Sequence, residues 1–180
     1  MHQFHCLNLT SFVNNRGITK DNEYELGSLS IGNSSFPESG VDWEKTFWFN
    51  QIPFKFSKTD YYDNLELIGQ TIPFEEMKVR TIHFLGVSSN GDFSEEISFY
   101  HKSKLVFKDR LYLSDFLSKK PMFSDQCAIK FEYLHSPSGR YKHVEPRLWY
   151  NTIHFDDFYH IDSITLEDNP FIHIFAITFS

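Results

Sequence analysis

Short apolar runs separated by turn signals at regular intervals are the feature that most constrains the fold of this chain. Within such a run, apolar Ile97 and Phe99 flank polar Ser98, an alternation that puts one face in a core and the other in water. Residues 89–92 carry the Asn-Gly pair of a tight hairpin, and no stretch has the period of a long amphipathic helix. We therefore predict an all-β, antiparallel β-sandwich with strands at 46–50, 52–56, 64–70, 78–87, 95–101, 104–113, 126–134, 141–154, 161–166 and 171–179.

The aromatic content supports an all-β fold. Phe, Tyr and Trp make up 18% of the chain, and strands hold such side chains well. The last run, 171–179, is apolar on both faces, which predicts a strand in the middle of a sheet. The polar stretch 14–46, rich in Gly, Asn and Ser, predicts a long irregular loop. With 180 residues and no Pro- or Gly-rich linker, the chain is expected to form one domain, 1–180.

The charge balance excludes some partners. Acidic residues outnumber basic ones by 24 to 17, so the chain lacks the excess of Lys and Arg that nucleic-acid binding requires. No apolar run is long enough to span a membrane, and no basic-then-apolar leader opens the chain. Cys6 and Cys127 fit no disulfide or zinc spacing. We expect a cytoplasmic protein without nucleic-acid or membrane partners, or a secreted one if a leader has been removed.

Several short segments occur together in an order found in a known family. They are NNRGIT at 14–19, SFPE at 35–38, IPFKF at 52–56, DNL and GQTI within 63–72, LGV at 85–87 and NPFIHIFAIT at 169–178. In this order the chain resembles the galactose-binding-domain-like jelly-roll modules found beside bacterial glycoside hydrolases. The resemblance implies a jelly-roll β-sandwich that binds carbohydrate through variable loops, without catalysis. It also implies that a structural calcium ion could be held, with Asn14, Asn15, Asp21 and Glu23 as available donors.

Strand parity predicts where a ligand would bind. In an antiparallel sandwich, successive connections lie at opposite ends, which groups 57–63, 88–94, 114–125 and 155–160 at one end. The connections 71–77, 102–103, 135–140 and 167–170 then fall at the other. Aromatic rings and carboxylates suit a polyol site. The first end would gather a carbohydrate-binding set of Tyr61, Tyr62, Asp92, Asp156, Asp157, Tyr159 and His160.

Other interpretations remain open. Residues 154–160 combine two histidines and two aspartates, which favours either a metal or acid–base site or a polar loop anchored by Phe155 and Phe158. No catalytic residues can be assigned, because nucleophile-elbow, phosphate-loop and paired-histidine patterns are all missing from the sequence. A structural protein that self-associates through a sandwich face, as a homodimer, is the main alternative to a carbohydrate-binding module. A metal-dependent or glycan-active enzyme is the third.

Overall fold

The computed structural model describes residues 4–180 and is built almost entirely of strands. Within these residues the only helical element is a three-residue 3-10 helix, η1 (Tyr24–Leu26), and no helix is long and apolar enough to cross a membrane. The predicted all-β class is therefore confirmed. The strands are β1 (His5–Cys6), β2 (Ile18–Thr19), β3 (Phe36–Pro37), β4 (Phe47–Phe49), β5 (Ile52–Phe54), β6 (Leu65–Ile68), β7 (Thr71–Ser88), β8 (Phe93–His101), β9 (Lys104–Leu113), β10 (Gln126–Lys130), β11 (Leu134–Ser136), β12 (Gly139–Tyr141), β13 (Arg147–Leu166) and β14 (Asp168–Phe179).

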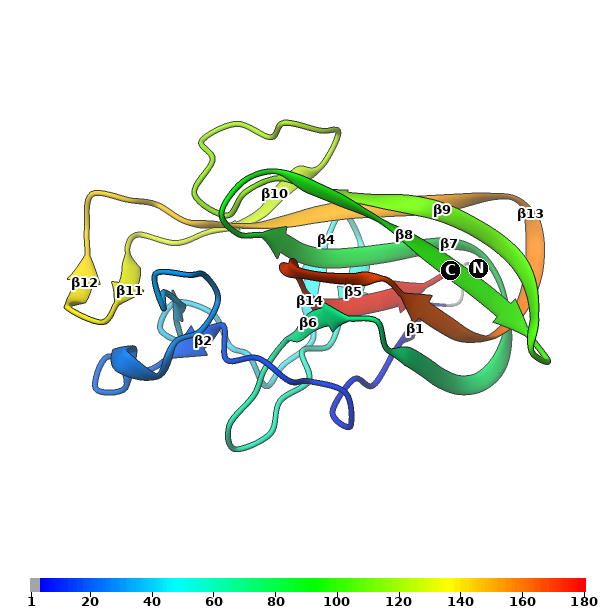
Figure 1. Cartoon of the computed structure of the whole chain (residues 1–180), viewed down its shortest axis with the longest axis horizontal. Helices are drawn as coiled ribbons and strands as arrows, with labels where there is room; N and C mark the ends of the chain where they lie inside the picture. Colours follow the sequence, from blue (N-terminus) through cyan, green and yellow to red (C-terminus); the bar gives the residue numbers. More distant parts are fainter. Residues whose placement is uncertain (1–3) are drawn as a thin grey trace.

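The main sheet has eight strands in the order β1-β14-β7-β13-β8-β9, with β6 beside β14 and β10 beside β13 (Figure 1). All of its pairings are antiparallel. Three two-stranded sheets are added: β2–β3, which is parallel, and the antiparallel pairs β4–β5 and β11–β12. The antiparallel sandwich expected from the sequence is thus observed.

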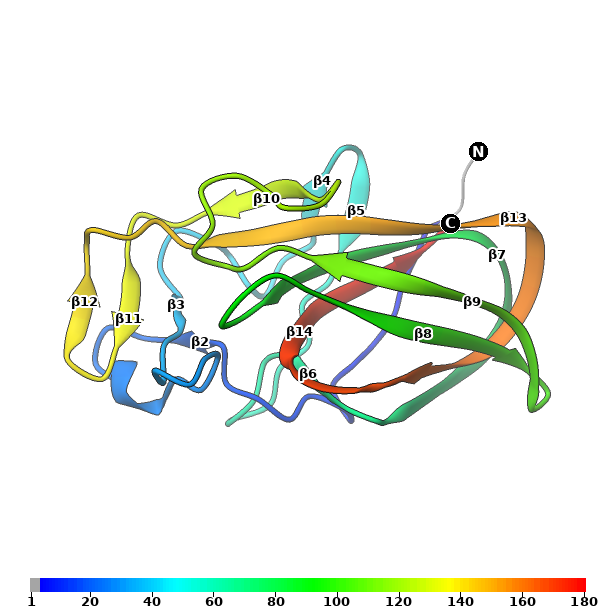
Figure 2. The same cartoon turned by 45° about the horizontal axis from the view of Figure 1, so that its top comes forward.

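Two long strands let one continuous sheet form both layers. β7 has 18 residues and β13 has 20, and their ladder is interrupted by register shifts between His154 and Tyr159 and between Ile161 and Ser163. Such bulges bend strands and increase their twist. Figures 1 and 2 show the two strands curving back together at the right-hand end, opposite the β11–β12 hairpin.

The predicted connections 71–77 and 155–160 are wrong, because these residues are strand. Residues 71–77 lie inside β7 and 155–160 inside β13, where the two strands pair with one another. Most of their polar side chains are exposed although the backbone is strand, so the polarity of these residues was mistaken for a loop signal. Most of 167–170 is also strand, since β14 begins at Asp168.

The Asn-Gly pair makes a turn but not a hairpin. Asn90 and Gly91 have φ of 62° and 132°, the left-handed conformations that favour these residue types. However, β13 lies between β7 and β8 in the sheet, so residues 89–92 carry the chain past β13. The predicted pairing of the flanking strands is therefore wrong, while the turn itself is present.

The core fixes the irregular N-terminal part of the chain on the sandwich. Residues 172–179 of β14 are all buried, as a strand apolar on both faces requires. Phe36, in the segment 14–46, packs its ring 4.6 Å from Phe131 and 5.7 Å from Phe175. Each such aromatic pair contributes about 1 kcal/mol beyond the burial of its area. This contact holds one wall of the pocket described below.

Candidate functional site

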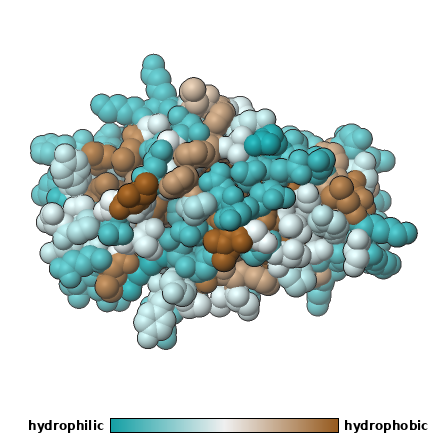
Figure 3. Space-filling view, viewed as in Figure 1, coloured by the Kyte–Doolittle hydropathy of each residue, from teal (hydrophilic) through white to brown (hydrophobic). Residues whose placement is uncertain are grey.

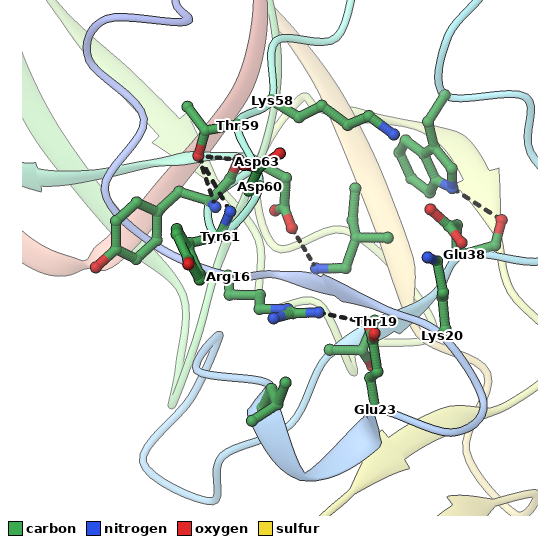
Figure 4. Close-up of a pocket in the computed structure, with 14 residues that line it drawn as sticks. Arg16, Thr19, Lys20, Glu23, Glu38, Lys58, Thr59, Asp60, Tyr61 and Asp63 are labelled. Atoms are coloured by element: carbon green, nitrogen blue, oxygen red, sulfur yellow. Dashed lines mark hydrogen bonds and ion pairs between the residues drawn. The ribbon is translucent and has the colours of Figure 1, made fainter.

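A pocket of about 490 Å³ opens between the N-terminal segment 16–26 and the loop 57–63, which joins β5 to β6 (Figure 4). Residues of the segment 38–43 close a third side. Its size falls in the range of sites for small ligands, roughly 300–1,000 Å³. The lining residues are Arg16, Ile18, Thr19, Lys20, Glu23, Leu26, Glu38, Trp43, Lys58, Thr59, Asp60, Tyr61, Tyr62 and Asp63.

The tyrosine loop, residues 57–63, is held in a fixed turn by Thr59. The Thr59 hydroxyl accepts the backbone N–H of Tyr61 at 3.3 Å and that of Tyr62 at 3.0 Å. The Thr59 N–H in turn donates to the Tyr62 carbonyl at 2.8 Å. Both rings project from this turn, with 70% of Tyr61 and 46% of Tyr62 exposed. In Figure 4 the Tyr61 ring stands at the edge of the pocket. The turn thus displays two rings that a ligand could contact.

Asp63 joins the tyrosine loop to the opposite wall. Its carboxylate accepts the N–H of Gly17 at 2.9 Å, the N–H of Ile18 at 3.0 Å and the side-chain amide of Asn64 at 3.0 Å. Burial raises the pKa of Asp63 to about 6, although these three donors oppose the rise. The two walls therefore keep a fixed spacing through one buried acid.

Both charge signs line the pocket. Arg16 pairs with Glu23 at 2.6 Å, and Lys58 pairs with Glu44 outside the pocket. Within residues 4–180 the side chains of Lys20, Glu38 and Asp60 have no ion-pair or hydrogen-bond partner, which leaves them free to bind hydroxyl or amide groups of a ligand.

A chain of polar groups supports the wall beneath Thr19. The Thr19 hydroxyl lies 2.6 Å from the Ser35 hydroxyl and 2.8 Å from Nδ1 of His135, whose Nε2 is 3.0 Å from Asp21. Hydroxyl, imidazole and carboxylate follow the order that activates nucleophiles in acyl transfer. Here Ser35 also holds the hydroxyl, and Thr19 is only 2% exposed. We therefore infer that these hydrogen-bonded side chains support the pocket wall.

Arg140 fixes the outer end of that chain. Its guanidinium binds both carboxylate oxygens of Asp21 and holds the pKa of that carboxyl below its ordinary value. Tyr133 donates a further hydrogen bond to Asp21 at 3.1 Å. The wall of the pocket is thereby connected to the β11–β12 hairpin, which lies far from it in the sequence.

The predicted binding residues lie in three places. Tyr61 and Tyr62 border the pocket. Asp92 lies in the connection after β7, where it accepts the N–H of Asp115 at 2.8 Å. The remaining residues are on β13: Tyr159 donates to Asp156 at 2.9 Å, Asp157 accepts the N–H of Phe158, and His160 contacts Glu76 at 2.9 Å.

The expected convergence of these seven residues at one end is wrong. Asn64, beside the tyrosine loop, bonds to His173, which pairs with Val87 of β7, whereas Tyr159 pairs with Val79. The two positions are eight residues apart along β7, about 26 Å of strand. The prediction failed because it counted 155–160 and 71–77 as connections. Carbohydrate binding by these residues stays a prediction.

The segment 154–160 is not the polar loop that was one of its two alternatives, and an acid–base role for it stays a prediction. It is a bulged part of β13, and of its two anchors only Phe155 is buried. Phe158 is 48% exposed, with the Lys78 ammonium 5.3 Å from its ring centre. Among residues 4–180, no group of three or more His, Cys, Asp and Glu side chains is arranged to hold a metal ion.

The four donors proposed for calcium do not form a ligand set. The Asn14 side-chain oxygen accepts the N–H of Glu66 at 2.7 Å, and that of Asn15 accepts from Asn64 at 3.1 Å. Asp21 is bound by Arg140, and Glu23 by Arg16. Each oxygen set is thus occupied by a donor from the protein, and calcium binding stays a prediction from the resemblance.

Sequence reasoning missed Arg16, Lys20, Glu38 and Lys58 as pocket residues. Arg16, Lys20 and Glu38 lie in the polar stretch 14–46, which was interpreted as a loop, as a source of calcium donors and as part of the family resemblance, and Lys58 lies in the tyrosine loop. The density of charge there, next to a loop with two adjacent tyrosines, was the available signal.

The family model described as AziU2-like beta-sandwich domain matches residues 5–180. Among curated proteins, no match to the chain was found.

Proposed function

Since the chain belongs to the AziU2-like β-sandwich family, we propose that it uses this scaffold as a non-catalytic module that binds a carbohydrate in the pocket beside the tyrosine loop. The observation that carries the proposal is the pairing of two exposed tyrosine rings with unpartnered charged groups in one pocket. A sugar has an apolar C–H face, which can pack on a ring, and hydroxyls, which need charged or amide partners.

The geometry of the pocket indicates which residues would contact the apolar face of the sugar and which would bind its hydroxyls. Tyr61 and Tyr62 would contact the apolar face of the sugar, because their turn leaves both rings accessible. Lys20, Glu38 and Asp60 would bind hydroxyls, since hydrogen bonds to charged groups contribute roughly 1.5–3 kcal/mol. The buried acid Asp63 would act only by fixing the walls, because three protein donors already occupy it.

The one face shown in Figure 3 also favours a pocket ligand over a flat partner surface. On the face shown in Figure 3, hydrophobic residues form separate patches among hydrophilic ones. A self-association face on a sheet would require a larger continuous patch. The homodimer stays a separate prediction, to be tested by light scattering.

A glycan array followed by isothermal titration tests the proposal. We expect Tyr61→Ala and Tyr62→Ala each to weaken binding about tenfold, in line with the loss of one ring contact. Tyr141→Ala is the matched control, because Tyr141 is 51% exposed on β12 and does not line the pocket. Equal losses for Tyr141→Ala and the loop variants would contradict the proposal, as would an array without any bound glycan.

A further inference from the structure

Two further hollows adjoin the pocket along the segment 38–44. A hollow of about 470 Å³ shares Glu38, Trp43 and Lys58 with the pocket. A third, of about 400 Å³, shares Gly40 and Val41 with the second and extends to the segment 129–133. Neighbouring hollows thus have walls in common. They form a row that begins at the tyrosine loop and ends at Tyr133.

The segment 38–44 is fixed well enough to serve as the floor of this row. Trp43 donates its indole N–H to the Glu38 carbonyl at 2.9 Å, which closes the segment on itself. The indole lies 6.0 Å from the Phe131 ring, with the planes 10° apart, and 4.7 Å from the Phe56 ring. In Figure 4 the Lys58 side chain extends toward the side of the pocket on which Glu38 lies. The wall shared by the first two hollows is therefore anchored in the core.

Gly40 keeps the passage between the second and third hollows open. A Cβ built on Gly40 would meet no atom within 4 Å, so the backbone faces free space there. Its φ of 91° lies in the left-handed region, which favours glycine. A side chain at this position would stand in the passage.

The far hollow has polar groups like those of the first. The Tyr133 hydroxyl lies 2.9 Å from the Ser39 hydroxyl, and charges of both signs come from Glu132 and from Lys130, whose ammonium pairs with Glu145 at 3.0 Å. A row of hollows of similar size, each lined by both polar and apolar groups, suits a chain of repeated units that carry hydroxyls and apolar C–H faces better than one compact ligand.

From this arrangement we infer that the ligand is a linear oligosaccharide, lying from the tyrosine loop across Gly40 to Tyr133. The inference rests on the proposed function, since it specifies the ligand of the same site. The tyrosine loop would bind one end of the chain, and each further hollow would add a subsite.

Binding of a chain-length series measures the number of subsites. The probes are the cellulose, starch, mannan and chitin oligosaccharides of one to six units, titrated calorimetrically into the intact chain. We expect the hexamer of the series that binds to be held about tenfold more tightly than its dimer, because added subsites add contacts. A hexamer bound no more tightly than the dimer would overturn the inference and leave the proposed function intact.

A blocking variant locates the path. Gly40→Asn should weaken the hexamer about tenfold, to the level of the dimer, while the dimer keeps its affinity. Gly139→Asn is the matched control, because Gly139 also has a left-handed φ, 109°, and open space around its Cβ position, outside the row of hollows.

Lys130→Ala at the far hollow provides a second test should Gly40→Asn fail to fold, and it too should weaken only the longer probes. If Gly40→Asn folds and leaves hexamer binding unchanged, the path across Gly40 is wrong. If no probe of any length binds, the proposed function fails together with the inference.

Discussion

Asp63 accepts the backbone N–H of Gly17 at 2.9 Å, and this bond joins the tyrosine loop to the opposite wall of the pocket. The two residues are 46 positions apart in the chain. The approach is close because Gly17 has no side chain: a Cβ there would lie 2.6 Å from the Asn64 amide nitrogen and 2.7 Å from the Phe175 ring. The pocket thus depends on one glycine and one buried acid.

Gly17→Ala should destabilise the protein by about 2 kcal/mol, because the added methyl overlaps Asn64 and the ring of Phe175. Urea unfolding of the variant beside the parent chain measures this loss. The matched control is Gly32→Ala, whose Cβ would meet its nearest atom, Ser30 Oγ, at 3.5 Å and should change stability by less than about 0.5 kcal/mol. Similar losses of stability in both variants would show that the loss in Gly17→Ala does not arise from the close contacts at that position.

The buried acid predicts a pH dependence of stability. The folded-state pKa of Asp63, about 6, lies above its ordinary value of 3.8, so between these pH values the folded chain holds the proton that the unfolded chain releases. The contribution of Asp63 to the free energy of unfolding therefore falls as pH rises from about 4 to 6, by about 3 kcal/mol in all.

Asp63→Asn tests this dependence, because an amide does not titrate. Denaturant unfolding at pH 4.5 and pH 7 should show that the stability difference between parent and variant is larger at pH 4.5. An equal difference at both pH values would mean that the acid titrates alike in the folded and unfolded chains.

The parts of the fold that follow from local pattern were predictable from sequence. β9 occupies the predicted 104–113, and β14 is buried on both faces as its composition requires. The long strands β7 and β13 were not predictable in full. Their bulged middle parts carry polar residues, and only their pairing with each other identifies them as strand.

The candidate site was predictable to a similar extent. Tyr61 and Tyr62 were placed in the connection 57–63, and both are exposed there. The opposite wall depends on the bond between Asp63 and Gly17, which no local pattern indicates. Grouping the connections by alternate ends of the sandwich could not predict this wall either, because the strands were miscounted at 71–77 and 155–160.

A buried histidine predicts acid sensitivity. Burial lowers the pKa of His173 from 6.5 to about 3, so between these values the unfolded chain binds the proton and the folded chain does not. The contribution of His173 to the free energy of unfolding therefore rises with pH across this window. On going down from pH 6.5 to pH 5, about 2 kcal/mol of it is lost. This dependence has the opposite sign to that of Asp63.

His173→Gln should remove this loss, so that between pH 7 and pH 5 the opposite dependence of Asp63 remains and the stability of the variant rises relative to the parent chain as pH falls, as measured by denaturant unfolding. The matched control is His143→Gln, since His143 is exposed and its replacement should leave the slope unchanged. A stability difference between His173→Gln and the parent chain that is the same at pH 5 and pH 7 would assign the acid sensitivity to other groups.

The separation between the tyrosine loop and β13 gives the last prediction, which rests on the proposed function. Tyr62→Ala should weaken binding of the saccharide identified by the array about tenfold, whereas Asp156→Ala should leave the affinity unchanged. The physical reason is distance: Tyr62 borders the pocket, while Asp156 lies on the bulged part of β13 and accepts a hydrogen bond from Tyr159 at 2.9 Å. Both side chains are exposed, so thermal melting should show a stability change of no more than about 0.5 kcal/mol for either variant. Isothermal titration of the two variants decides the matter. Equal weakening by both would require a ligand that reaches β13, and would restore the single site that the sequence predicted.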